Sequence, residues 1–540
     1  MPGVGEQPAA RDTGVRGDRR WGTIPNLARS AAERFGADEA IVDGDVHLTF
    51  ADLWADARRA GRAFVAAGVE PGDRVAIWAP NVHEWVVALL GLQAAGAVVV
   101  PINTRYKGDE AAYLLRTSRA KVLVGVDGFL GTHHLALLAG HDLPHLERTV
   151  VLRGTGPGGA QPWDAFLAEG DAVPDADLDA RLAALGPDDV SDILFTSGTT
   201  GNPKGVVCTH GQTLRGYADW AAIVGLRRDD RYLVVNPFFH SFGYKAGIVA
   251  ALTVGATIVP QAVFDIPQAM ANVAAHQITA LPGPPAIYQT FLNQPDLDRA
   301  ALSSLRLAVT GAAPVPVELI ERMKAELGFE TVVTAYGLTE ACGIVTVCWP
   351  DDPPERISAS SGRAIPGVEV RVVDDHGHEV ERGQPGEIVV RGYNVMRGYF
   401  EDPERSAEAV DAHGWLRTGD IGTMDAHGYV AITDRKKDMF ICGGFNAYPA
   451  EIERVLLTHP DIAQAAVIGV PDERLGEVGM AFVVPRSGAA VDPDEVVAWA
   501  RERLANFKAP RRVEVLDALP VNASNKVLKG ELRARAAGSA

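Results

Sequence analysis

The chain has 540 residues, 47% of them hydrophobic and 22% charged, so it is long enough for more than one hydrophobic core and has a globular composition. Its formal net charge of −18 and its pI near 5.3 argue against general nucleic-acid binding, because a phosphate backbone needs a basic surface. An anionic ligand must therefore be held by a local site.

The N-terminal region and the most apolar segment argue against a signal peptide and a membrane span. Residues 1–20 combine arginines with Gly and Pro, and no apolar run follows them, so we expect a flexible tail. The apolar segment 85–102 is interrupted by Gly91 and Gln93 and contains Pro101 near its end. This pattern predicts a buried helix followed by a strand, with no integral membrane segment.

Short apolar runs alternate with helical patterns through the first three quarters of the chain. Predicted strands at 75–80 and 97–103 flank a predicted helix over 82–95, which is typical of βαβ units. The same strand pattern returns at 231–237, 256–261 and 305–313. We therefore expect an α/β fold, with a large multi-layered N-terminal body that contains two α/β subdomains.

The pattern changes twice towards the C-terminus. From about Val368, short strands and turns predict a β-rich subdomain that closes the body. A charged run at 434–438 predicts a domain boundary, with a large domain over 21–434 and a small, mobile α+β domain over 435–540. In the small domain we expect a helix at 449–460, a strand and turn at 463–472, and a second helix at 491–505.

Cysteine usage favours a reducing compartment. The four cysteines form no CxxC pair and no Cys/His set with zinc-ligand spacing: Cys208, Cys342, Cys348 and Cys442. We therefore expect a cytoplasmic protein. The sequence leaves open whether the chain forms a homodimer.

The strongest local signal is the run TSGTTGNPKG at 196–205, directly after the apolar residues DILF. Its glycines let the backbone approach an anion, its hydroxyl groups can donate, and its lysine supplies a cation. Pro203 and Gly205 do not fit the GxxxxGK[ST] P-loop, and the apolar flanks predict a loop between two strands. We interpret the run as a polyphosphate-binding loop with the candidate residues Thr196, Ser197, Gly198, Thr199, Thr200, Gly201 and Lys204.

Five motifs, in a fixed order, resemble the adenylate-forming superfamily of acyl-CoA synthetases, peptide-synthetase adenylation domains and beetle luciferases. They are the loop at 196–205, YGLTE at 336–340, TGD at 418–420, Asp434-Arg435 and Asn525-Lys526. The resemblance covers essentially the whole chain after the tail. It implies a ligase that joins a small-molecule carboxylic acid to coenzyme A through an acyl-adenylate, with ATP, Mg2+ and CoA.

The resemblance also implies roles in forming the adenylate. A carboxylate must attack the α-phosphate of ATP, and two anions repel unless cations stand between them. Lys526 is expected to be the catalytic lysine, Glu340 a Mg2+ ligand, and Thr339 a residue near the α-phosphate. Asp420 is expected to accept hydrogen bonds from the ribose hydroxyls, and Arg435 to donate to the same sugar.

Further positions are expected around the adenine and the acyl group. The adenine is expected to lie against Tyr336, with the strand-end and turn residues Gly311, Ala312, Ala313 and Gly337 beside it. His240, inside the aromatic run NPFFHSFGY, is expected to border the acyl pocket and to screen the carboxylate from the thiol entrance. A core histidine is the alternative interpretation.

The second half-reaction requires the CoA thiol to reach the acyl carbonyl. The resemblance implies that the small domain rotates about Lys437, and that Gly443 and Gly444 line the channel for the thiol arm. Many relatives have glycine before the catalytic lysine, whereas this chain has Asn525. Some aryl-CoA ligases share that Asn, so we expect no loss of activity.

Several alternatives concern the acceptor and the acid. Only 14 residues follow Lys526, so a carrier-protein acceptor would be a separate protein, and free CoA is simpler. No feature demands a luciferase-like oxygenase, and a non-catalytic sensor would be expected to have lost Lys526, Glu340 or the loop. The segments that most resemble actinobacterial ligases of a steroid-derived indanedione propanoate are 236–247, 281–289, 310–323 and 441–453. A medium-chain fatty acid or an aryl acid is the alternative.

Overall fold

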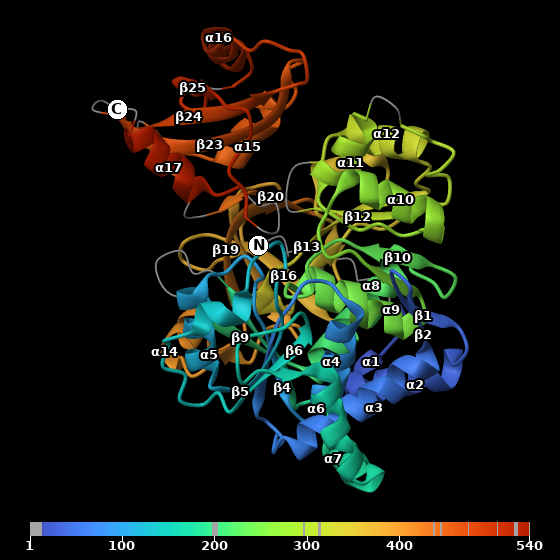
Figure 1. Ribbon diagram of the computed structural model, residues 1–540. Coiled ribbons are helices and arrows are strands. Elements are labelled where there is room, and N and C mark those ends of the chain that lie inside the picture. Colours follow the sequence, from blue (N-terminus) through green and yellow to red (C-terminus); the bar gives the residue numbers. More distant parts are fainter. Residues whose placement is uncertain are drawn as a thin grey trace.

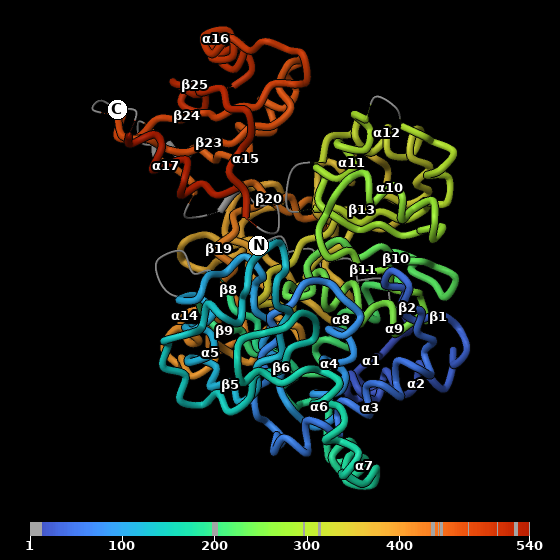
Figure 2. The backbone as a smooth tube through the Cα atoms, viewed as in Figure 1, coloured from blue at the N-terminus to red at the C-terminus, as the bar shows by residue number. Residues whose placement is uncertain are grey.

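The computed structural model shows a large α/β body and a smaller α+β domain at the C-terminal end, which confirms the predicted fold class (Figure 1). The small domain, orange to red, lies at one end of the body, as the tube view also shows (Figure 2). The structure describes residues 13–196, 203–294, 297–311, 315–435, 438–442, 445–472, 475–504, 506–522 and 527–538.

An eight-stranded sheet forms the centre of the body, with the order β18-β9-β8-β4-β3-β5-β6-β7. The strands from β8 to β7 in this order are parallel, whereas β9 and β18 run antiparallel to their neighbours. Their bounds are β3 Arg74–Trp78, β4 Val98–Pro101, β5 Ala120–Val126, β6 Arg148–Arg153, β7 Gln161–Pro162, β8 Val190–Thr196, β9 Lys204–Thr209 and β18 Gly398–Tyr399. The strands predicted at 75–80 and 97–103 are confirmed as β3 and β4.

Helices cover both faces of this sheet. Alternate residues of β3 belong to two different hydrophobic clusters, one shared with α3 (Phe50–Ala66) and α4 (His83–Ala94), the other with α5 (Gly108–Ser118). All α4 residues from Trp85 to Ala94 are buried, which confirms the predicted buried helix, because a helix that is apolar on every side needs cover on every side. Among the described residues, no helix has the length and apolar character to cross a membrane.

A second sheet has the order β10-β11-β1-β2, and the backbone of Ala280 bridges it to the sheet β12-β13-β14-β15. The bounds are β1 Glu39–Asp43, β2 Val46–Thr49, β10 Arg231–Val234, β11 Thr257–Pro260, β12 Leu307–Thr310, β13 Thr331–Tyr336, β14 Thr346–Val347 and β15 Arg363–Ala364. The other helices of the body include α2 Ile24–Phe35, α6 Trp163–Glu169, α7 Asp175–Ala184, α8 His210–Val224, α9 Ala250–Val254, α10 Ile266–His276, α11 Pro285–Leu292, α12 Val317–Leu327, α13 Pro354–Ala359 and α14 Pro403–Ala409. The strands predicted at 231–237, 256–261 and 305–313 are confirmed as β10, β11 and β12.

The β-rich part of the body is an antiparallel sheet of β16 Val368–Val373, β17 Gly386–Gly392, β19 Leu416–Met424 and β20 Val430–Arg435. The small domain has its own sheet, with β21 Phe440–Cys442, β22 Phe445–Ala447, β23 Ile462–Asp472, β24 Gly476–Pro485 and β25 Arg512–Val515. Its helices are α15 Pro449–Leu456, α16 Pro493–Arg503 and α17 Lys529–Gly538. The small domain's hydrophobic cluster is separate from that of the body, which lets it fold around its own core.

Residues 13–20 differ from the expected flexible tail. They include a short helix, α1 (Gly17–Arg20), which packs on α8. A Cβ atom on Gly17 would lie 2.3 Å from the carbonyl oxygen of Leu214, so a glycine is required for this close contact. The hydroxyl of Thr13 also donates a hydrogen bond to Asp219 of α8. Residues 1–12 lie outside the described part of the chain.

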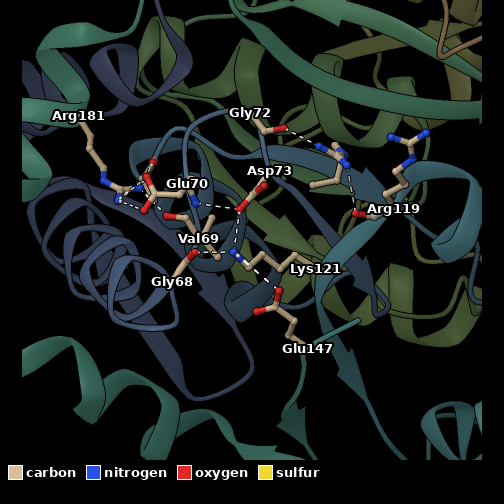
Figure 3. A network of polar contacts seen from close by, with 11 residues as sticks. Gly68, Val69, Glu70, Gly72, Asp73, Arg119, Lys121, Glu147 and Arg181 are labelled. Carbon is tan, nitrogen blue, oxygen red and sulfur yellow. Dashed lines mark hydrogen bonds and ion pairs between the residues drawn. The ribbon is translucent and has the colours of Figure 1, made fainter. Parts of the chain in front are cut away.

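Two ion pairs lie where parallel strands of the body begin. At the start of β3 and β5, Lys121 Nζ lies 3.2 Å from Asp73 Oδ2 (Figure 3). Ahead of β10 and β12, Arg306 Nε donates to Asp230 Oδ1 at 2.7 Å, and both side chains are largely buried. We call these four residues the scaffold pairs. In each, a carboxylate is matched by a cation of the protein itself.

Candidate functional site

The predicted phosphate loop connects two paired strands, as its apolar flanks indicated. Strands β8 and β9 are antiparallel, and Thr196 is the register partner of Lys204. The ammonium of Lys204 lies 4.7 Å from the ring centroid of Tyr399, at the tip of β18. The loop residues Ser197, Gly198, Thr199, Thr200 and Gly201 lie outside the described residues.

The YGLTE motif forms a tight turn after β13. The strand ends at Tyr336, and a short 3-10 turn, η4 (Thr339–Ala341), carries Glu340. A Cβ atom on Gly337 would lie 2.1 Å from the carbonyl oxygen of Gly343, so the chain can fold back on itself only with glycine at this position. The residues predicted to bind the adenine, the α-phosphate and Mg2+, namely Tyr336, Thr339 and Glu340, therefore lie within one short segment.

Tyr336 and Asp420, two residues predicted to bind the nucleoside, lie in direct contact. The Tyr336 hydroxyl donates to Asp420 Oδ2 at 2.6 Å, and the backbone N–H of Asp420 donates to Thr418 Oγ1 at 3.1 Å. Asp420 of β19 is the register partner of Arg435 in β20, although the side chain of Arg435 lies outside the described atoms. The structure thus joins the YGLTE and TGD motifs, which are far apart in the sequence.

Glu340 is held at two points by one segment that the sequence analysis did not identify. Met396 N–H donates to the backbone carbonyl of Glu340 at 2.9 Å, and the Tyr399 hydroxyl donates to Glu340 Oε1 at 3.1 Å. Burial and the neighbouring carboxylate raise the pKa of Tyr399, so its hydroxyl stays a protonated donor. A half-buried carboxylate beside the predicted phosphate residues fits the oxygen preference of Mg2+.

The aromatic loop with His240 adjoins the YGLTE turn. His240 is exposed, which excludes a core histidine, and its Nδ1 accepts a hydrogen bond from the N–H of Phe242 at 3.2 Å. A Cβ atom on Gly343 would lie 2.8 Å from the Ser241 side chain, so the residue after His240 packs against the end of the turn. The predicted acyl-pocket loop therefore lies beside the turn that carries the predicted ATP residues.

A buried polar cluster contacts Cys342, the residue that follows the η4 turn. Lys245, on a π-helix over Phe242–Val249, lies 3.0 Å from Asp192 Oδ1, and neither side chain is exposed. The Lys245 ammonium also donates to Cys342 Sγ at 3.3 Å. Hydrogen bonding from the Cys208 thiol and the charge of Lys245 lower the pKa of Cys342. The Lys245–Asp192 pair could not be predicted from a local sequence pattern, because the two residues come from distant segments.

Other predicted positions are only partly described. Gly311 follows β12, and a Cβ atom there would lie 2.8 Å from the carbonyl oxygen of Ala335, so the two strand ends approach closely. The remaining predicted positions lie outside the described residues and stay predictions: Ala312, Ala313, Lys437, Gly443, Gly444, Asn525 and Lys526.

Comparison with known families decides the classification. A family described as AMP-binding enzyme matches residues 28–400, and one described as AMP-binding enzyme C-terminal domain matches residues 451–526. The chain belongs to the AMP-binding enzyme family. The predicted activity, that of an ATP-dependent acyl-CoA synthetase, is confirmed by this membership together with the relatives below.

Two curated relatives are both named as a methyl-dioxo-octahydroindenyl-propanoyl:CoA ligase. The Rhodococcus jostii protein is 52% identical over 516 residues, which cover 95% of this chain and 98% of the relative. The Mycobacterium tuberculosis protein is 50% identical over 511 residues, with the same coverage of 95% and 98%. Among solved structures, an anthranilate CoA ligase in complex with anthranoyl-AMP is 28% identical, with a TM-score of 0.87 over 96% of this chain and 98% of that one.

Proposed function

We propose that this AMP-binding enzyme converts methyl-dioxo-octahydroindenyl propanoate, a steroid-derived bicyclic acid, into its CoA thioester. ATP is cleaved to AMP and pyrophosphate in the process. The observation that carries the proposal is the identity of 52% and 50%, over nearly the full length, to two ligases named for that acid.

In the first half-reaction, a carboxylate oxygen of the acid attacks the α-phosphorus of ATP, and the bond from that phosphorus to pyrophosphate breaks. Lys204 and the loop before it would hold the phosphates, and Lys526 would neutralise the charge between the reacting anions. Glu340 would hold Mg2+, which supplies positive charge to the phosphate oxygens when bound. The half-buried carboxylate of Glu340, held by Tyr399, supports this assignment.

The nucleoside of ATP would lie along Tyr336 and Asp420. The short hydrogen bond between them orients the Asp420 carboxylate, whose oxygens can accept from the ribose hydroxyls. The tyrosine ring supplies a flat apolar surface for the adenine. Arg435, opposite Asp420 in the β19–β20 register, would donate to the same sugar.

In the second half-reaction, the CoA sulfur attacks the acyl carbonyl, the carbon–oxygen bond to AMP breaks, and the thiol proton is lost to solvent. Gly443 and Gly444 would leave room for the thiol arm, and the small domain would rotate about Lys437 between the two half-reactions. The separate hydrophobic cluster of the small domain supports its movement as a unit.

We also infer a cytoplasmic setting for the reaction. The four cysteines are buried free thiols, a state that is usual in a reducing compartment. Cytosolic ATP and CoA would be available to the enzyme there.

The test is an assay of the purified protein with ATP, Mg2+ and CoA across a panel of acids. The panel contains the indanedione propanoate, a medium-chain fatty acid and an aryl acid such as ferulate, and mass spectrometry follows AMP and acyl-CoA. We expect the highest kcat/KM for the indanedione propanoate. A higher kcat/KM for either other acid would contradict the proposed substrate, and acyl-AMP accumulation with no CoA consumption would point to a carrier-protein acceptor.

A further inference from the structure

Tyr399 lies between two charged residues of the candidate site. Its hydroxyl donates to Glu340 Oε1 at 3.1 Å, and the Lys204 ammonium lies 4.7 Å from the centroid of its ring. The three residues come from three segments: the turn η4, the strand β9 and the two-residue strand β18. One side chain thus contacts both the expected metal ligand and the expected phosphate ligand.

Backbone contacts fix the place of Tyr399. Strand β18 pairs with β9, with Tyr399 opposite Val206, and the next residue, Phe400, donates its N–H to the Gly205 carbonyl at 2.7 Å. The N–H of Tyr399 itself donates to Ser406 Oγ at 2.8 Å. The backbone of the tyrosine is therefore attached to the strand that leaves the phosphate loop, and its side chain is held in place by its contacts with Glu340 and Lys204.

The contacts of Tyr399 suit a residue that orients ligands. A neutral hydroxyl donor fixes one oxygen of Glu340 but adds no positive charge, so the carboxylate keeps its attraction for a cation. The bond is made to Oε1 and does not involve Oε2. The aromatic face attracts the Lys204 ammonium and directs it without neutralising it.

We propose that Tyr399 is a positioning residue that sets Glu340 and Lys204 together for the triphosphate and its cation. The inference rests on the proposed roles of Glu340 and Lys204. It adds that one side chain links these roles, so that its hydroxyl governs the metal dependence of ATP binding and its ring governs the hold on the phosphates.

Two substitutions separate the hydroxyl from the ring. Tyr399→Phe removes the bond to Glu340 and keeps the ring, whereas Tyr399→Leu removes both. ATP binding is measured by calorimetry over a range of Mg2+ concentrations, without acid or CoA. For Tyr399→Phe we expect the Mg2+ concentration at half-maximal effect to rise about tenfold, with metal-free ATP binding unchanged. Tyr399→Leu should show the same shift and also weaker metal-free binding.

Tyr393 offers a matched control from the same part of the chain. Its hydroxyl donates to Asp219 Oδ2 at 3.4 Å, and the Arg215 guanidinium lies 3.8 Å from its ring centroid, so it has the same two kinds of contact away from Glu340. Tyr393→Phe should leave the Mg2+ curve unchanged. A tenfold shift in this control would overturn the inference, because the effect would then not depend on Glu340.

Glu340→Gln distinguishes failure of this inference from failure of the proposed site. If Glu340→Gln shifts the Mg2+ curve and Tyr399→Phe does not, the inference is overturned and the metal role of Glu340 stands. If neither variant shifts the curve, both are overturned. Thermal unfolding of each variant confirms that the comparison is made between folded proteins.

Discussion

Carboxylates in two parts of the body have different partners. In the scaffold pairs, Asp73 and Asp230 face Lys121 and Arg306, so each negative charge is matched within the protein. At the candidate site, Asp420 and Glu340 accept hydrogen bonds from the hydroxyls of Tyr336 and Tyr399. A hydroxyl orients a carboxylate without cancelling its charge. The scaffold carboxylates are thus matched by cations of the protein itself, and we propose that the Glu340 carboxylate keeps its charge for a ligand.

The largest expected effect is on the buried scaffold pair. Asp230→Asn leaves the Arg306 guanidinium buried without its counter-charge, which should cost about 3–5 kcal/mol of unfolding free energy. The activity of the remaining folded protein should stay within about twofold, because the pair precedes β10 and β12, away from the site. Urea unfolding measures the loss, and the double variant with Arg306→Met, which removes both charges, should recover part of it. A loss of unfolding free energy below about 1 kcal/mol would contradict the stabilising role that the comparison gives to the buried scaffold pair.

Glu340→Gln should lower activity and leave stability almost unchanged, which is the reverse of the effect expected for Asp230→Asn. The amide keeps an acceptor for Tyr399 but loses the charge that attracts the cation, so kcat/KM for adenylation should fall about a hundredfold, or about 2.7 kcal/mol. The free energy of unfolding should change by less than about 0.5 kcal/mol. Pyrophosphate exchange into ATP gives the first quantity and urea unfolding the second. Unchanged exchange would mean that this carboxylate is not reserved for the reaction.

Asp420→Asn should weaken ATP binding by a smaller amount. A hydrogen bond to a charged acceptor contributes about 1.5–3 kcal/mol, so the KM for ATP should rise about tenfold or more. ATP analogues that lack one ribose hydroxyl provide the control. Wild-type enzyme should discriminate against at least one of them, and Asp420→Asn should discriminate less. Equal discrimination by both proteins would place the ribose elsewhere.

The smallest expected effect is on the exposed scaffold pair. Lys121 and Asp73 keep 22% and 28% of their side-chain surface exposed, so water screens their attraction. Lys121→Met should therefore cost only about 0.2–1 kcal/mol of unfolding free energy, with no change in adenylation. Urea unfolding of the wild-type protein at increasing salt concentrations tests the same screening of the pair. A loss as large as that of Asp230→Asn would show that burial does not separate the two pairs.

Most of the fold could be predicted because the elements have strong local patterns. The segment from Trp85 to Ala94 is apolar on every side, which indicates burial in any arrangement, and β3 and β4 are bounded by turn residues. The docking of Gly17 on Leu214 could not be predicted, because a glycine at a close contact resembles a glycine in a tail.

The site was predicted unevenly for a similar reason. Tyr336, Glu340 and Asp420 stand in recognisable motifs, and the structure brings their segments together. Tyr399 stands in a short strand whose partner, β9, lies far away in the sequence, and strand pairing over such a separation is not encoded locally. The Lys245–Asp192 pair was missed because its charges come from a π-helix and a distant strand.

The most direct test of the central claim follows oxygen from the acid. The indanedione propanoate is labelled with 18O at both carboxylate oxygens and converted with ATP, Mg2+ and CoA. Attack on the α-phosphorus, followed by cleavage of the acyl carbon–oxygen bond, should leave one 18O in AMP and one in the thioester. Label in phosphate or pyrophosphate, or an AMP without label, would contradict an acyl-adenylate.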